Sequence, residues 1–173
     1  MFKIKKCILM ITLFVFMLMI VSCKDKEKED ETSSGKTTGY TSNEVFEKLS
    51  DSMKDQPDMT TVTSADEGSK NVFLIFSEVD FDKVEDFVFS YSTKGLADEI
   101  IVVHTKDSAD ATSVKKDLEK RLQSRKATFE EYNPEEGKKF EGAVVLTQDN
   151  CIVLLIGNQA QNGKYEFNKM FDK

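Results

Sequence analysis

The chain has 173 residues, a length that suits one domain of ordinary size, and its 24 Lys and Arg against 31 Asp and Glu give a formal net charge of −7. This acidic balance argues against a nucleic-acid partner, because affinity for phosphate comes mainly from clustered Lys and Arg. One His and three Cys supply few ligands for a zinc site and exclude a disulfide-rich scaffold.

The N-terminus has the layout of a secretory signal, with a basic start followed by an apolar run. Lys3, Lys5 and Lys6 precede the run over 7–21, which only Thr12 interrupts. Spanning a bilayer as a helix takes roughly 20 residues, and this run is shorter. We therefore expect a signal peptide, with an uncleaved anchor as the open alternative.

The apolar run ends in Ile20-Val21-Ser22-Cys23. This end resembles the lipobox of bacterial lipoproteins, and the resemblance implies a signal peptide over 1–22 and diacylation of Cys23 on its sulfur. Two acyl chains give stable anchoring, whereas one gives only marginal binding. We predict a protein held in the lipid bilayer through acylated Cys23, on the outer face of the cytoplasmic membrane. The alternative is an ordinary signal peptide followed by a coincidental cysteine.

The mature chain is predicted to have two parts. Residues 23–42 hold the lipidated cysteine and an acidic stalk, because a stretch with high charge and low hydrophobicity cannot bury enough area to offset chain entropy. Residues 43–173 form a single folded domain.

The folded part begins with a predicted amphipathic helix over 43–54, with an N-cap at Ser42 or Asn43. The segments 60–63 and 71–79 stay open between helix and strand, because a short apolar run does not distinguish them. The open region extends to residue 91, with a helix start expected at Asp80-Phe81-Asp82 and a strand as one interpretation of 87–91.

The clearest elements lie downstream: a strand over 99–105, a helix over 110–132, a hairpin of 143–146 with 151–157, and a helix over 165–171. The hairpin turn contains Asp149 and Asn150, which tolerate positive φ values. This order predicts an α+β domain with a small, largely antiparallel sheet and helices packed on one face, in two layers.

Two short motifs carry a family resemblance. Ala97-Asp98-Glu99-Ile100 precedes the predicted strand, and Tyr132-Asn133-Pro134 follows the long helix. Over roughly residues 44–172 the chain resembles the domain of unknown function 4358 family, small lipoproteins of Gram-positive, mostly clostridial, bacteria. The resemblance implies no activity, because none is established for that family. His104 departs from the family, which usually has Lys or a small residue there.

Two single residues, His104 and Cys151, are of types that can act in catalysis. His104 is the only histidine, a residue type that can act as a general base near neutral pH, but no nucleophile accompanies it in a recognisable motif, so we expect a surface residue at the strand end. Cys151 opens an apolar strand, which predicts a buried structural thiol rather than a reactive one.

Asp98 and Glu99 are adjacent, so on a strand their side chains point to opposite faces and cannot easily form an acid/base pair. We expect a salt bridge from one of them to Arg121 or Arg125, with a functional role as the alternative. These four residues and Tyr132 form a candidate polar cluster for binding or structure.

No metal and no cofactor are predicted. The acidic stretch that starts at Asp80 fails as a calcium loop, because its sixth and twelfth positions hold Glu85 and Tyr91 instead of Gly and Glu. No Gly-rich phosphate loop is present.

These observations favour a non-catalytic binding or accessory module that engages a protein or another component of the cell envelope. The alternative is an envelope enzyme whose site comes from scattered polar residues: Asp98, Glu99, Arg121, Arg125, Tyr132 and His104. A pocket that holds three or more of them within hydrogen-bond reach would favour the enzyme. A solute-binding lipoprotein is disfavoured, because 131 folded residues provide one lobe.

Overall fold

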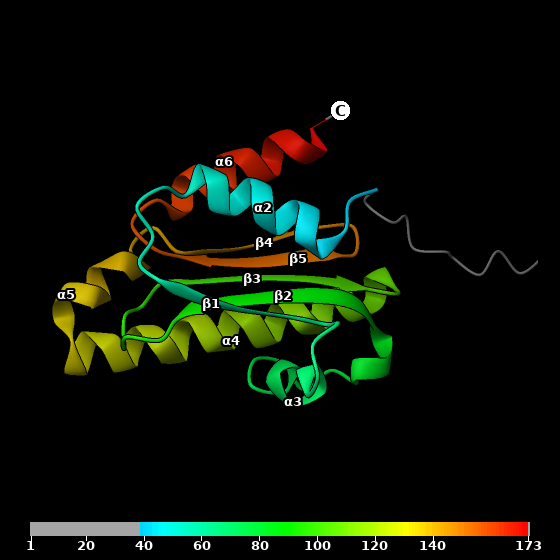
Figure 1. Cartoon of the computed structure of the whole chain (residues 1–173), viewed down its shortest axis with the longest axis horizontal. Coiled ribbons are helices and arrows are strands. Elements are labelled where there is room, and N and C mark those ends of the chain that lie inside the picture. The colour runs from blue at the N-terminus through cyan, green and yellow to red at the C-terminus, as the bar shows by residue number, and fades with distance from the viewer. Residues whose placement is uncertain (1–38, 173) are drawn as a thin grey trace, which may run out of the picture. The chain divides into compact units, whose positions relative to one another are not determined.

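The computed structural model describes residues 39–172, so the predicted signal peptide, Cys23 and most of the predicted stalk lie outside the described residues. This part forms a sheet flanked by helices (Figure 1). The strands are β1 (Met59–Thr63), β2 (Val84–Ser92), β3 (Glu99–Thr105), β4 (Val144–Gln148) and β5 (Cys151–Ile156). The helices are α2 (Ser42–Ser52), α3 (Ser69–Phe73), α4 (Ser108–Tyr132), α5 (Pro134–Gly137) and α6 (Ala160–Phe171), with the 3-10 turns η1 (Phe81–Lys83) and η2 (Lys138–Phe140).

The five-stranded sheet has the order β1-β2-β3-β5-β4, and these four pairings are all antiparallel. The predicted α+β class and antiparallel sheet are thus confirmed. β3 occupies the centre, coincides with the predicted strand over 99–105 and is buried at each of its residues. Among residues 39–172, no helix combines the length and the hydropathy that crossing a bilayer requires.

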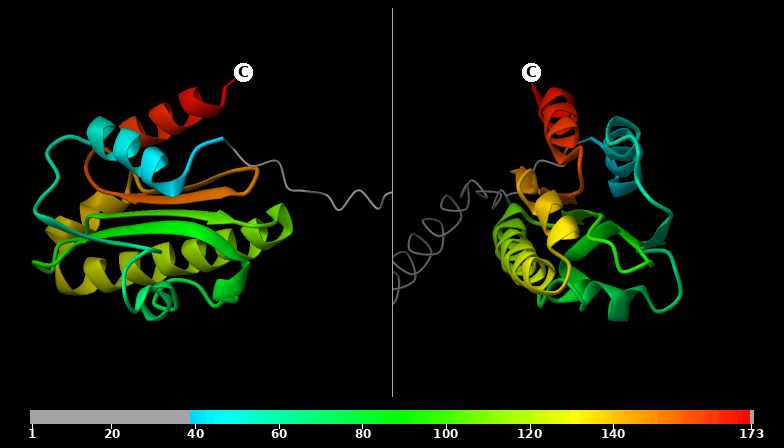
Figure 2. Two further views of the ribbon diagram at one scale, coloured as in Figure 1. Left: turned by 45° about the vertical axis from the view of Figure 1, so that its right-hand side comes forward. Right: turned by 90° about the vertical axis from the view of Figure 1, so that its left-hand side faces the viewer.

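Helices cover both faces of the sheet, so the expectation of a two-layer domain with helices on one face is wrong. α2 and α6 lie on one face, and α4 and α3 lie on the other (Figures 1 and 2). The residues of β3 alternate between two cores: Ile100 and Val102 pack under α2 and α6, whereas Ile101 and Val103 pack under α4. A strand that is apolar on both faces needs cover on both, and β5 is likewise buried along its whole length.

Two separate elements share the face that α4 covers. α4 packs across β3, β4 and β5. α3 and the loop that follows it cover β2 instead, through a phenylalanine cluster in which Phe73, Phe76 and Phe87 have ring centroids 5.0 to 5.7 Å apart. A seam therefore remains between α4 and residues 74–78.

The segments that the sequence left open are now assigned. Residues 59–63 form the edge strand β1, and the apolar run over 71–79 divides between the end of α3 and the loop after it. The expected helix start at Asp80 is the short turn η1, where the Asp80 carboxylate accepts the N–H of Asp82 at 3.1 Å. β2 begins directly afterwards, at Val84.

α2 lies where it was predicted, but its N-cap is Thr41 rather than Ser42 or Asn43. Thr41 and Glu44 form a capping box, in which the Thr41 side chain accepts the Glu44 N–H and the Glu44 carboxylate accepts the Thr41 N–H. The Ser42 side chain is consequently left to turn inward, and the residue is 1% exposed.

The C-terminal elements follow the prediction with two differences. Only Asp149 of the hairpin turn takes a positive φ, 52°, while Asn150 is buried and donates to the Thr105 carbonyl at 2.7 Å. α6 begins at Ala160, earlier than the expected residue 165. Its extra turn contains Gly163, where a Cβ would lie 2.7 Å from Leu155, so glycine allows the close approach to the sheet.

Candidate functional site

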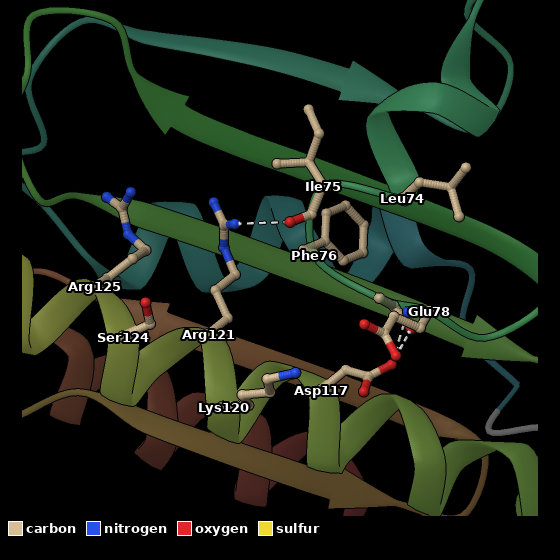
Figure 3. Close-up of a pocket in the computed structure, with 10 residues that line it drawn as sticks. Leu74, Ile75, Phe76, Glu78, Asp117, Lys120, Arg121, Ser124 and Arg125 are labelled. Atoms are coloured by element: carbon tan, nitrogen blue, oxygen red, sulfur yellow. Dashed lines mark hydrogen bonds between the residues drawn. The ribbon is translucent and has the colours of Figure 1, made fainter.

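The seam beside α4 opens into a groove of about 250 Å³, which we call the α4 groove. One wall is the loop after α3, and the other is the side of α4 that faces this loop (Figure 3). Its lining residues are Leu74, Ile75, Phe76, Ser77, Glu78, Asp117, Lys120, Arg121, Ser124 and Arg125. The groove thus combines an aliphatic wall with a row of basic side chains.

Arg121 is held by the first residue of the central strand. Its Nε and Nη2 donate to the two carboxylate oxygens of Glu99 at 2.7 and 2.8 Å, and its Nη1 donates to the Ile75 carbonyl at 3.2 Å. Glu99 is completely buried, because it shares the α4-facing side of β3 with Ile101 and Val103. The pair confirms the predicted salt bridge, and it ties α4, β3 and the loop together beneath the groove.

Arg125 lies one helical turn further along α4 and faces the same carboxylate. Its Nε is 3.3 Å from Glu99 Oε2, and its Nη2 donates to the Ala97 carbonyl at 3.2 Å. Burial, helped by the nearby Arg121 charge and opposed by Glu99, lowers the pKa of Arg125 below its usual value. An arginine nevertheless stays protonated at neutral pH, so two positive charges share one buried negative charge.

The guanidinium groups also stack on aromatic rings. Arg121 lies 5.4 Å from the centroid of Phe89, and Arg125 lies 5.3 Å from that of Phe129. Such contacts hold a planar guanidinium in one orientation. The two arginines of the groove are therefore positioned before any ligand arrives.

The opposite end of the groove is acidic. Asp117 Oδ2 accepts the Ser77 hydroxyl at 2.8 Å and the Glu78 N–H at 2.9 Å, which fixes the loop against α4 (Figure 3). Glu78 is exposed. The groove consequently carries charge of opposite sign at its two ends.

Asp98 does not join this arrangement. It is 4% exposed, and its carboxylate accepts the Lys139 ammonium at 2.6 Å, with Glu136 as the second acceptor at 2.9 Å. Burial alone would lower the pKa of Lys139, but the bonds to the two carboxylates raise it above its usual value. The sequence indicated a carboxylate–arginine pair for Asp98 or Glu99, and only Glu99 has one.

His104 is buried, at 3% exposure, so the prediction of a surface residue is wrong. Its Nδ1 lies 2.9 Å from Ser42 Oγ and 3.2 Å from Asp86 Oδ1. Burial alone would raise the pKa of Asp86, but the bonds from His104 and Ser42 lower it below its usual value. Ser42 and Asp86 therefore both contact Nδ1 of the His104 ring. In a catalytic triad the serine and the aspartate contact different ring nitrogens of the histidine. The start of α2 covers this end of β3. Ser42 and His104 are 62 residues apart in the chain, so their contact could not be predicted from local sequence patterns.

The remaining candidates lie elsewhere. Tyr132 is 78% exposed at the last residue of α4 and does not line the groove. Cys151 is buried in β5, as predicted, and burial raises the pKa of its thiol. Within residues 39–172, no group of three or more metal-ligating side chains is assembled.

Of the ten residues that line the groove, sequence reasoning identified only Arg121 and Arg125. Leu74 and Ile75 were part of the unassigned run over 71–79, so their exposure could not be foreseen. Lys120 and Ser124 flank the arginines at helical spacing, and this pattern was the available signal for a shared face.

The comparisons place this domain in a family. The chain belongs to the family described as domain of unknown function (DUF4358), whose model matches residues 58–157. The match runs from β1 through β5 and includes the whole α4 groove with Glu99, but neither α2 nor α6. It is narrower than the span 44–172 expected from the sequence. No significant match was found among curated proteins or among solved structures.

Proposed function

We propose that this protein is a membrane-anchored lipoprotein outside the cytoplasm, and that its α+β domain is a non-catalytic binding module of the cell envelope. The observation that carries the binding role is the α4 groove, which is lined by two exposed aliphatic side chains, Leu74 and Ile75, and by basic side chains of α4. The lipobox-like sequence ending in Cys23 and the acidic stalk support the anchoring.

The distribution of polar side chains supports binding over catalysis. Of the six residues proposed for an enzyme site, Arg121 and Arg125 both contact Glu99, but only the two arginines line the groove. Asp98 and His104 lie on the opposite side of β3 from Glu99, and Tyr132 points to solvent. A general base must reach the proton that it removes, and this division separates the candidates from one another.

Anchoring is tested by replacing the cysteine that would be acylated. We expect Cys23→Ala to abolish incorporation of a labelled fatty acid and to leave the protein unprocessed or released into the medium. Cys7→Ala changes the other N-terminal cysteine, which would leave with the signal, and should preserve labelling and membrane retention. Unchanged processing, labelling and retention of Cys23→Ala would refute lipidation.

Binding is tested on intact cells that express the full chain. Chemical cross-linking should give a discrete adduct of the wild-type protein, whereas the released Cys23→Ala protein should lose it. Hydrolytic or transfer activity that persists in the purified protein and disappears with Arg125→Lys would contradict the non-catalytic role.

A further inference from the structure

The α4 groove has a basic end on a strongly acidic domain. Residues 39–172 contain 16 Lys and Arg against 26 Asp and Glu, a balance of −10. Three of these basic residues, Lys120, Arg121 and Arg125, line the groove within two turns of α4. Glu99 neutralises one positive charge, so the end of the groove around Arg125 keeps an excess of positive charge.

Several donors at this end remain open to a ligand. The guanidinium of Arg121 donates to Glu99 and to the Ile75 carbonyl. Within residues 39–172, in contrast, no partner accepts from Arg125 Nη1 or pairs with the Lys120 ammonium. The Ser124 hydroxyl lies between them on the same wall (Figure 3). Ammonium and guanidinium donors form strong, charge-assisted hydrogen bonds with carboxylates.

The opposite wall is apolar and exposed. Leu74 and Ile75 are 53% and 61% exposed, and they are adjacent in the chain. Within residues 39–172, the other two exposed large hydrophobic side chains, Tyr132 and Tyr165, do not line the groove. Adjacent exposed aliphatic residues beside a concave surface are typical of a binding site.

The groove has the length of a short peptide. From Asp117 to Arg125, α4 advances eight residues, or about 12 Å at the helical rise of about 1.5 Å per residue. An extended chain covers that length in about four residues. The acidic end at Asp117 and Glu78 suits the N–H groups or a basic side chain of such a segment.

We infer that the α4 groove binds an extended segment of a partner polypeptide. A carboxylate of this segment, from Asp, Glu or a chain terminus, meets Lys120 and Arg125, and an aliphatic side chain packs against Leu74 and Ile75. The inference rests on the proposed binding function and adds the chemistry of the partner. An anionic lipid surface is the poorer occupant, because recognition of such surfaces uses larger basic clusters and the domain as a whole repels negative charge.

The test places a photo-cross-linking amino acid, p-benzoylphenylalanine, in the full chain on intact cells. At position Ile75 it faces the groove, and at position Tyr165, which is 71% exposed on α6, it serves as the matched control. We expect a protein adduct from Ile75 only. Peptide mapping should locate the adduct within about four residues of a carboxylate in the partner.

Charge variants decide whether the contact is the proposed one. Lys120→Glu should reduce the Ile75 adduct about tenfold or more, because an attraction at the carboxylate becomes a repulsion. Lys116→Glu makes the same change on an exposed position of α4 outside the groove and should leave the adduct intact. Replacing the mapped partner carboxylate with Lys should restore the adduct of Lys120→Glu.

The outcomes separate the inference from the proposed function. A lipid or glycan adduct at Ile75 overturns the polypeptide partner but leaves a binding module. A protein adduct that is indifferent to Lys120→Glu also overturns the inference. A membrane-retained protein with no adduct at Ile75, and no adduct in the chemical cross-linking, overturns both.

Discussion

The two faces of β3 bury ionisable groups in different ways. On the α4 face, Glu99 lies beneath two arginines whose combined charge exceeds its own, and the excess opens onto a groove. On the α2 face, His104 and Asp86 bond to Ser42 at the start of a helix. A buried charge needs only a partner within the fold, whereas a surplus of charge at an open groove invites a ligand.

The comparison predicts the largest effect for the ion pair of the α4 face. Arg121→Ala should lower the free energy of unfolding by about 3 kcal/mol, because it leaves Glu99 buried with only the longer contact to Arg125. Urea denaturation measures this change. Lys126→Ala on the same helix removes an exposed pair with Glu130 at 3.7 Å and should cost about 0.5 kcal/mol or less. Equal costs for the two variants would mean that the buried pair is no more important than a surface one.

On the α2 face, the informative substitution is at the neutral residue Ser42, which bonds to both His104 and Asp86. Ser42→Ala should lower the free energy of unfolding by about 1–3 kcal/mol, because the buried His104 ring and the half-buried Asp86 carboxylate lose a hydrogen-bond partner. Ser52→Ala on the same helix removes only a bond to the Leu49 carbonyl, which keeps the Met53 N–H, and should cost less. Thermal or urea unfolding of the two variants checks the order, and the reverse order would contradict the buried network.

The smallest effect concerns acid stability. The folded-state pKa of Asp86 lies below its ordinary value of 3.8, so the carboxylate stabilises the fold above about pH 4. That contribution is lost as the pH falls through the lowered pKa. Asp86→Asn keeps the shape but removes the titration, so its stability should fall less between pH 5 and pH 3. Urea unfolding across this range measures the slopes, and parallel curves for variant and wild type would contradict the role of Asp86.

Local signals were enough for the long elements. The β-branched run over 99–105 and the helical period of residues 110–132 each predicted the observed element, because the pattern exceeded the length at which helix and strand are ambiguous. Residues 60–91 contain shorter runs, and there the packing of phenylalanines under α3 and along β2 selected the conformation. The groove could not be predicted for the same reason, because one of its walls, residues 74–78, lies in this ambiguous region.

The error about layers has a related cause. The consecutive apolar residues of β3 indicated a strand that is covered on both faces. This pattern is consistent with a layer of helices on each face of the sheet. Extending it to the whole sheet required knowing that β5 lies next to β3. Only the pairing of strands separated by nearly fifty residues provides that neighbour.

By itself the sequence determined the class of the fold, its central strand and long helix, the burial of Cys151 and a salt bridge between Asp98 or Glu99 and an arginine of the long helix. The elements follow from hydrophobic periodicity, which can be read within one segment of the chain. The salt bridge follows from the free-energy cost of burying an unpaired charge, for which the sequence offers few partners. Tertiary structure decided that His104 is buried, that Asp98 pairs with Lys139, and that Leu74 and Ile75 face Lys120 and Arg125 across a groove. Those outcomes depend on which distant segments meet, and long-range packing alone determines that.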